Sequence, residues 1–131
     1  MEDLKIQPTD SSFAIDLDVK SSQFTFQGES RPENAPGFFD PVLNWLKSYK
    51  NSIERKENRI ELKVIFKLDY FNSTSTKYIV DIVKILKTIG DSSMVDLDIK
   101  WYYKEIDEDI KESGIELSEW TDLKIDMIPF D

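Results

Sequence analysis

Four consecutive hydrogen-bonding residues, Asn72-Ser73-Thr74-Ser75, are the part of this sequence best suited to chemistry. They lie between a stretch with strand periodicity and one with helical periodicity, which places their hydroxyls beside the unpaired amides of a helix N-terminus. Those amides and the positive end of the helix dipole would favour a phosphate ester on one of the hydroxyls. The structural interpretation is that one residue caps the helix and the others form a turn, as such segments commonly do.

Two other groups of residues invite a chemical interpretation. Lys77 follows Ser73 by four residues, as in a Ser–Lys nucleophile pair, but nothing in the sequence would desolvate its amine. Asp107, Glu108 and Asp109 suggest a magnesium site, but three consecutive carboxylates on a helix do not converge on one point. Acidic residues in a first helical turn are stabilised by the helix dipole, which explains them without a metal.

The sequence contains neither histidine nor cysteine. Ser-His-Asp and Cys-His catalysis, histidine phosphorelay, disulfides, thiolate metal sites and most zinc sites are therefore excluded. The formal net charge of −9, from 26 acidic and 17 basic residues, opposes binding to nucleic acid or to an anionic membrane surface. We expect a non-enzymatic binding or regulatory protein without a cofactor or a metal.

Length and composition predict one domain covering residues 1–131. Apolar residues make up 40% of the chain, and 8 Phe, 5 Tyr and 3 Trp can fill a core without disulfides. Residues 1–5 lack the basic start and apolar run of a signal peptide, and no segment is apolar for the length that spans a bilayer. A cytoplasmic location is therefore expected.

Strand periodicity accounts for the elements that precede and follow the hydroxyl cluster. Alternating apolar residues predict a hairpin over residues 13–27 and strands over 60–70 and 95–103, with a last strand near 123–127. The strand–helix–strand unit over 60–103 is expected to be a crossover joining two parallel strands.

Helical spacing of apolar residues predicts helices over residues 40–51 and 75–89, and a short acidic helix over 107–113. Cap residues suggest where each helix begins or ends. Asp40 followed by Pro41 indicates a start, and Gly90 and Gly114 indicate ends.

The fold class predicted from these elements is α/β. Parallel strands covered on both faces normally have continuous apolar runs, whereas the strands of this sequence alternate between apolar and polar residues. We therefore expect a mixed sheet with its helices on one face and the other face open to water or to a partner.

Five motifs follow one another along the chain: Pro32-Glu33-Asn34-Ala35; Phe38-Phe39-x-Pro41 with Trp45-Leu46-x-x-Tyr49; Tyr70-Phe71-Asn72-Ser73-Thr74-Ser75-x-Lys77; Trp101-Tyr102-Tyr103; and Asp107-Glu108-Asp109 with Gly114-x-Glu116. In this order they resemble the SiaC family of regulatory phosphoproteins, and the resemblance extends from about residue 4 to residue 130.

The resemblance implies a STAS-like fold, similar to anti-sigma-factor antagonists, in which a βα superhelix carries its helices on one side of a mixed sheet. It also implies partner switching in cyclic-di-GMP signalling that controls biofilm formation or aggregation. A kinase of the histidine-kinase-like ATPase type phosphorylates such a protein, a PP2C-type phosphatase restores it, and the unmodified form binds and activates a diguanylate cyclase. The family's phosphoacceptor follows the Asn of the strand–helix turn, which here is Ser73, where the family usually has Thr; Thr74 is the second choice.

A switch works most simply when the modified group lies in the interface that it controls. We therefore expect a partner-binding surface made of Pro32, Glu33, Asn34, Asn72, Ser73, Thr74, Ser75 and Lys77. Two alternatives remain open at this point. One is a STAS-like antagonist acting on an anti-sigma kinase, and the other, less favoured, is a small metal-dependent enzyme that uses the carboxylates near Asp107.

Overall fold

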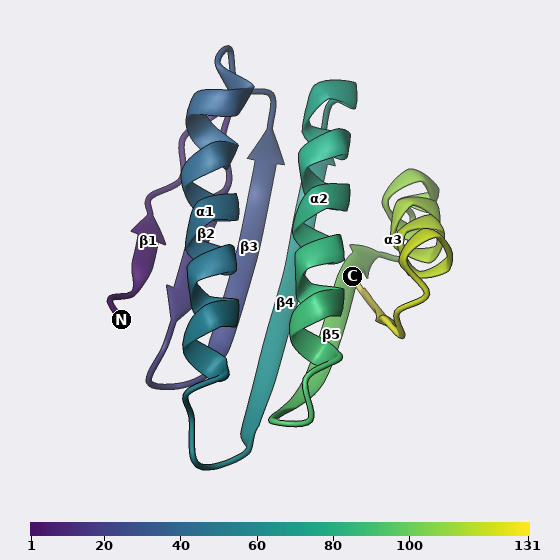
Figure 1. Cartoon of the computed structure of the whole chain (residues 1–131). Helices are drawn as coiled ribbons and strands as arrows, with labels where there is room; N and C mark the ends of the chain where they lie inside the picture. The colour runs from purple at the N-terminus through teal and green to yellow at the C-terminus, as the bar shows by residue number, and fades with distance from the viewer.

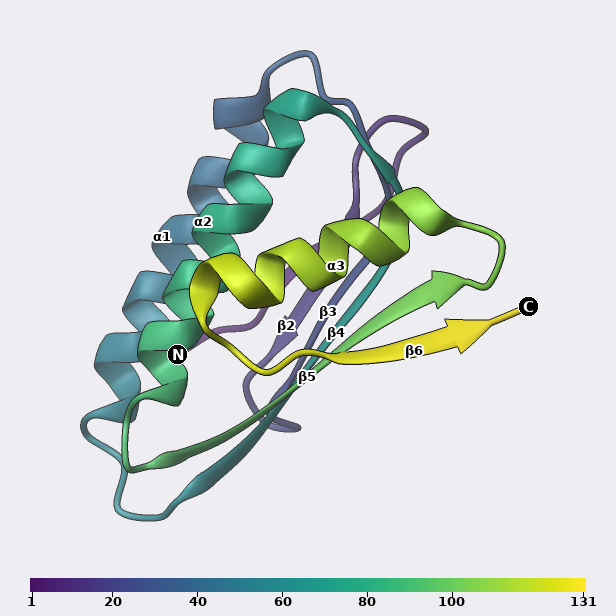
Figure 2. The ribbon, with the colours of Figure 1, turned by 90° about the vertical axis from the view of Figure 1, so that its right-hand side faces the viewer.

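A six-stranded mixed sheet carries three helices on one of its faces in the computed structural model, which describes residues 1–131 (Figures 1 and 2). The strands are β1 (Leu4–Ile6), β2 (Ala14–Asp18), β3 (Gln23–Ser30), β4 (Ile60–Phe71), β5 (Val95–Lys104) and β6 (Asp126–Phe130). The helices are α1 (Ala35–Ile53), α2 (Ser73–Gly90) and α3 (Glu108–Thr121). Strands β1 to β3 pair antiparallel, and β3 to β6 pair parallel in chain order. The predicted α/β class and the mixed sheet with helices on one face are confirmed.

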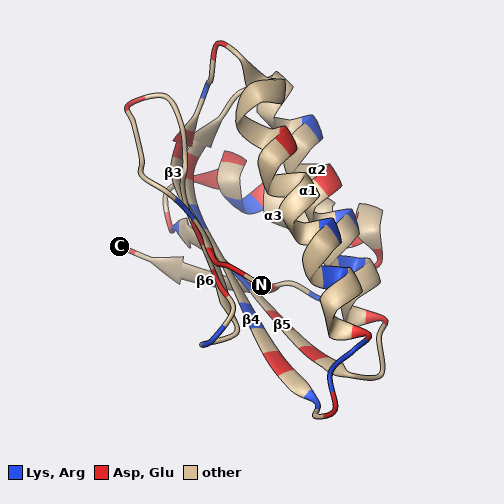
Figure 3. Ribbon diagram, turned by 60° about the vertical axis from the view of Figure 1, so that its left-hand side comes forward, with Lys and Arg blue, Asp and Glu red and all other residues tan.

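The alternation of side chains along the strands gives the sheet two different faces. In β4, Leu62, Val64 and Phe66 are buried beneath the helices, while Glu61 and Lys63 between them point to solvent. Figure 3 shows the charged residues that this pattern places along β4 and β5. The core therefore occupies only the layer between the sheet and the helices, and the opposite face of the sheet carries no layer.

The three helices cover the sheet in two different orientations. Helices α1 and α2 lie side by side over the middle of the sheet (Figure 1), where the rings of Phe39 and Tyr78 stack with centroids 4.8 Å apart. Helix α3 is steeply inclined to α2 and crosses β5 (Figure 2). The indole of Trp101 in β5 contacts α3 and donates a hydrogen bond to the Ile110 carbonyl at 2.9 Å.

Helix α1 begins at Ala35, five residues before the predicted start at Asp40, and it ends at Ile53 rather than at residue 51. Asn34 is the N-cap, since its Oδ1 accepts a hydrogen bond from the Gly37 amide at 3.2 Å. Asn34 and Asp40 are both cap residues that a proline follows closely. The helix begins after Asn34, because this start also buries Ala35 in the core. Pro41 consequently lies inside the helix.

Of the two glycines predicted to end helices, Gly90 does so and Gly114 does not. Helix α3 continues through Gly114 to Thr121, and Gly90 is the last residue of α2. A Cβ on Gly114 would lie 2.6 Å from Cδ1 of Trp101, and one on Gly90 would lie 2.7 Å from Cδ2 of Leu97. Glycine at these positions permits close packing of a helix on the sheet.

The strands differ from the sequence prediction in three places. Strand β1 was not predicted, because three residues are too few for a periodic signal. Strand β3 continues past residue 27 to Ser30. The last strand is Asp126–Phe130 rather than residues 123–127, and it contains Pro129. This proline is tolerated because β6 lies at the edge of the sheet and pairs only with β5.

Candidate functional site

The hydroxyl cluster predicted from the sequence joins the carboxyl end of β4 to the first turn of α2. Asn72 is the N-cap of this helix: its Oδ1 accepts a hydrogen bond from the Ser75 amide at 2.9 Å. Its backbone carbonyl accepts two more bonds, from the Thr76 amide at 3.0 Å and from Thr76 Oγ1 at 3.1 Å. The turn is therefore held by its own hydrogen bonds, and Asn72 serves mainly to cap the helix.

The hydroxyls of this turn differ sharply in their accessibility. Ser75 is fully buried, and its Oγ lies 2.8 Å from the Oγ of Ser30 and donates to the Ser30 carbonyl at 3.2 Å. Ser73 and Thr74 are exposed, and their hydroxyls have no hydrogen-bond partner in the protein. Ser75 therefore supports the turn from below, and only Ser73 and Thr74 present free hydroxyls to a modifying enzyme.

Ser73 and Thr74 face different neighbours, because successive helical residues are rotated by about 100°. Ser73 shares a side of α2 with Thr76, which faces α3 across a groove. Thr74 shares a side with Tyr78, which stacks on Phe39 of α1. A charge added to Ser73 would therefore lie on the α3 flank of α2 and one added to Thr74 on the α1 flank, a distinction that the sequence prediction missed.

The loop predicted to belong to the same surface does lie beside the turn. The Asn72 amide donates to the Ser30 carbonyl at 3.0 Å, so the chain leaves β3 next to the first turn of α2 (top of Figure 1). Pro32, Glu33 and Asn34 follow immediately and lead into α1. Glu33 and Asn34 are exposed and Pro32 is half-buried, so the loop and the turn form one accessible edge.

Charged and aromatic groups near this edge complete its surface. Arg31 pairs with Glu29 at 3.0 Å and places its guanidinium 4.7 Å from the centre of the exposed Tyr70 ring. The sequence prediction did not single out Arg31, because only the pairing of β3 with β4 brings it over Tyr70. Lys77 is exposed one turn into α2 and forms no ion pair.

The carboxylates near the start of α3 have a structural role. Asp107 is the N-cap of this helix, with its Oδ1 accepting a hydrogen bond from the Ile110 amide at 3.1 Å. Nowhere in the protein do three His, Cys, Asp or Glu side chains converge in a way that could hold a metal ion. Asp107 thus caps α3, and Glu108 and Asp109 lie in its first turn.

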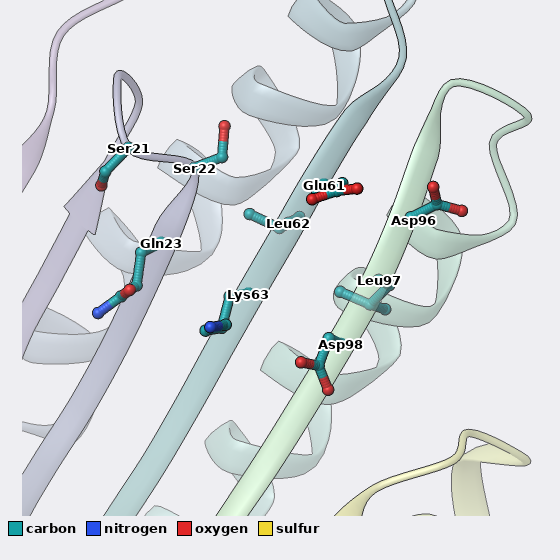
Figure 4. A pocket seen from close by; sticks show the side chains of 9 residues that line it. All are labelled: Ser21, Ser22, Gln23, Glu61, Leu62, Lys63, Asp96, Leu97 and Asp98. Atoms are coloured by element: carbon teal, nitrogen blue, oxygen red, sulfur yellow. The ribbon is translucent and has the colours of Figure 1, made fainter.

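A polar hollow lies at the opposite end of the strands from the turn Asn72–Ser75. It occupies about 430 Å³ on the open face of the sheet, and Glu61, Lys63, Asp96 and Asp98 point into it (Figure 4). Arg59 hydrogen-bonds Asp96, with Nε 2.9 Å from Oδ2, and this holds the pKa of the Asp96 carboxyl below its ordinary value. The hollow is open and its carboxylates are interleaved with cations, so we assign it no chemistry.

Membership of a family follows from comparison over almost the whole chain. Residues 6–130 match the family model described as SiaC family regulatory phosphoprotein. The chain belongs to the SiaC family. An uncharacterized protein of Pseudomonas aeruginosa, PA14_02130, is 29% identical to it over 119 residues, which cover 91% of this chain and 90% of that protein.

Solved SiaC structures have the same fold. The crystal structure of apo-SiaC from P. aeruginosa matches with a TM-score of 0.82 at 25% identity, covering 98% of this chain and 99% of that one. SiaC of the same organism bound to the diguanylate cyclase SiaD, of which it is the activator, matches with a TM-score of 0.84 at 25% identity, covering 98% and 100% of the two chains. The resemblance inferred from the motifs is thereby confirmed.

None of the three helices is apolar over a stretch long enough to cross a membrane.

Proposed function

We propose that residues 1–131 form a cytoplasmic, non-enzymatic regulatory domain that binds and controls a diguanylate cyclase, with phosphorylation of Ser73 as its switch. A kinase of the histidine-kinase-like ATPase type adds the phosphate and a PP2C-type phosphatase removes it. The observation that carries this proposal is the free, exposed Ser73 hydroxyl at the start of α2 in a member of this family. A cyclase as the partner is supported by the complex of SiaC with SiaD.

The local structure supports a phosphate on Ser73 and opposes one on Ser75 or Thr76. The first amides of a helix have no intrahelical partner, and the positive end of the α2 dipole stabilises an anion beside them. Thr76 and Ser75 are engaged in hydrogen bonds, and Ser75 is buried as well. Modification of Ser73 therefore leaves the fold intact and acts on binding.

The cyclase-binding surface in this proposal comprises the loop Pro32, Glu33 and Asn34 together with Asn72, Ser73, Thr74 and Lys77. Ser75 acts from beneath as the residue that holds the turn in place. The unmodified surface accepts the cyclase, because its hydroxyls are neutral and small. A phosphate carries about −1.5 to −2 charges at neutral pH, and desolvating them in an interface opposes binding.

The decisive experiment is phosphopeptide mapping after treatment with the cognate kinase, combined with cyclase binding. We expect the phosphate on Ser73, and we expect Ser73→Ala to keep its fold and to bind the cyclase whether or not the kinase is present. Ser73→Asp should weaken cyclase binding incompletely, since it carries less charge than a phosphate. Modification confined to Thr74, with Ser73→Ala still released by the kinase, would contradict the assignment.

A further inference from the structure

A groove separates α2 from α3 on the helical side of the molecule. It has a volume of about 220 Å³, and Phe71, Ile79 and Leu117 contribute apolar side chains to it. Thr76 lines it from α2, and Glu116 and Trp120 line it from α3. The groove exists because α3 crosses the sheet at a steep angle to α2 (Figure 2), so the two helices diverge. It therefore combines an apolar interior with a polar and aromatic rim.

Trp120 is unusual among the three tryptophans because 60% of it is exposed. The indole of Trp45 donates a hydrogen bond to the Glu2 carbonyl, and that of Trp101 donates to the Ile110 carbonyl. The indole of Trp120 has no acceptor within the protein. An exposed tryptophan beside an apolar groove, with a free donor, has the properties of residues that anchor protein interfaces.

The charge of α3 identifies the kind of partner that fits. This helix carries Glu108, Asp109, Glu112, Glu116 and Glu119, and its only basic residue is Lys111. None of the ion pairs in the protein involves any of these carboxylates; the ion pairs all lie elsewhere. The carboxylates are therefore available to external cations, and Glu116 is the one that lines the groove. An apolar groove bordered by an acidic helix complements a helix that is apolar on one side and basic beside it.

We propose that the α2–α3 groove docks a basic amphipathic helix of a protein partner. A large apolar side chain of that helix packs beside Trp120 over Phe71 and Leu117, and flanking Lys or Arg residues pair with Glu112 and Glu116. This surface adjoins the turn assigned to the cyclase at Ser73, and it extends from there along the α3 side of α2, where the loop Pro32–Asn34 contributes no residue.

Phosphorylation of Ser73, which is part of the proposed function, should strengthen binding at the groove, whereas it weakens binding at the cyclase surface. Ser73 lies one turn before Thr76 on the side of α2 that faces the groove. A phosphate there adds about −1.5 to −2 charges to the negative charge of Glu116 and of the rest of α3, and it attracts a basic helix more strongly. The groove is therefore suited to a partner that engages the modified form, while the loop surface is suited to one that engages the unmodified form.

The test uses two short helical peptides as probes, one with leucine on one face and lysine beside it, and one with glutamate in place of the lysine. NMR of the isotope-labelled full chain should show the Trp120 indole signal moving on addition of the lysine peptide, while the signal of the buried Trp101 indole stays in place. Trp120→Ala and Glu116→Lys should each weaken binding by about tenfold. The matched control Glu57→Lys, the same charge change in the loop between α1 and β4, should alter it by less than about twofold.

Equal weakening of peptide binding by Glu116→Lys and Glu57→Lys, or equal binding of both peptides, would show attraction to net charge alone. Either result would overturn the proposal that the groove is the docking site. Protein phosphorylated at Ser73 should bind the lysine peptide more tightly than unmodified protein, and unchanged or weaker binding would overturn the coupling. Docking on unmodified protein needs no phosphate, so failure of kinase treatment to modify Ser73 would count against the proposed function and not against the groove.

Discussion

In the turn Asn72–Ser75, the buried and the exposed hydroxyls have different roles. The Oγ atoms of Ser30 and Ser75 lie 2.8 Å apart in the interior and join the end of β3 to the start of α2. Asn72 closes the same turn from the other side by capping Ser75. With these groups holding the backbone, the hydroxyls of Ser73 and Thr74 contribute no internal bond and can be modified without loss of structure.

Aspartate substitutions at the two ends of this turn should have opposite consequences for stability. Ser75→Asp would bury a carboxylate beside Ser30 and should lower the free energy of unfolding by about 3 kcal/mol or more. Ser73→Asp places the same charge in solvent at a helix N-terminus and should change it by less than about 1 kcal/mol, in the stabilising direction. Urea unfolding of both variants measures the difference. Equal destabilisation would contradict the burial of Ser75.

The exposed pair formed by Arg59 and Asp96 gives a pH-dependent signal. Hydrogen bonding from Arg59 lowers the pKa of the folded Asp96 carboxyl, so its contribution to stability is complete above the unfolded pKa of about 3.9 and is lost as the pH falls through the folded pKa. NMR of the carboxyl carbon should therefore show that Asp96 titrates with a midpoint below pH 3.9, the reference value of about 3.9 being that of an unfolded aspartate. Arg59→Gln should move the midpoint upward, and no movement would show that Arg59 does not cause the shift.

At the scale of the elements, each helix is placed by a cap and by one close contact with its neighbour. Asn34, Asn72 and Asp107 are the three caps, and each accepts a hydrogen bond from an amide three residues further along the chain. The caps all follow the carboxyl ends of parallel strands, which gathers the helix N-termini at one edge of the sheet. That edge carries the loop and the turn of the proposed switch.

Substitution of the two possible caps of α1 should distinguish where this helix begins. Asn34→Ala removes the acceptor for the Gly37 amide and should lower the free energy of unfolding by about 1 kcal/mol. Asp40→Ala alters an exposed residue inside the helix and should change it by less than about 0.5 kcal/mol. Thermal or urea unfolding of both variants provides the measurement. The reverse order would restore Asp40 as the helix start.

At the scale of the whole molecule, the helices form one layer and leave the other face of the sheet uncovered. Ile82 of α2 is fully buried in the layer between helices and sheet. Ile65 of β4 lies on the opposite face, where its side chain is only half-buried. The same residue type therefore occupies two environments that differ because of the layer arrangement alone.

Aspartate at each of these isoleucines should reveal that asymmetry. Ile82→Asp would bury an unpaired charge and should leave the chain without a cooperative melt. Ile65→Asp keeps its carboxylate near solvent and should retain a cooperative transition with a lower midpoint. Circular dichroism during heating separates the two outcomes. A transition of Ile82→Asp that matches the parent would contradict the place of α2 against the sheet.

The sequence by itself determined the features that depend on neighbouring residues. Alternation along residues 60–70 and 95–103 was sufficient to predict two long strands, and the mixed sheet with one covered face followed from it. The strand–helix turn at Asn72 and the SiaC-family motifs were equally visible. These features are local, because a strand or helix face repeats every two or about 3.6 residues whatever lies across from it.

Only the tertiary structure decided which of these residues are free. Ser73 and Ser75 are both serines in one short turn, yet Ser75 is buried because β3 brings Ser30 against it from 45 positions away in the sequence. Gly114 lies inside a helix that its residue type alone was expected to end. Glycine is needed there because Trp101 fills the space that a side chain would take. Contacts between distant segments determine burial and close approach, and no periodic pattern along the chain records them.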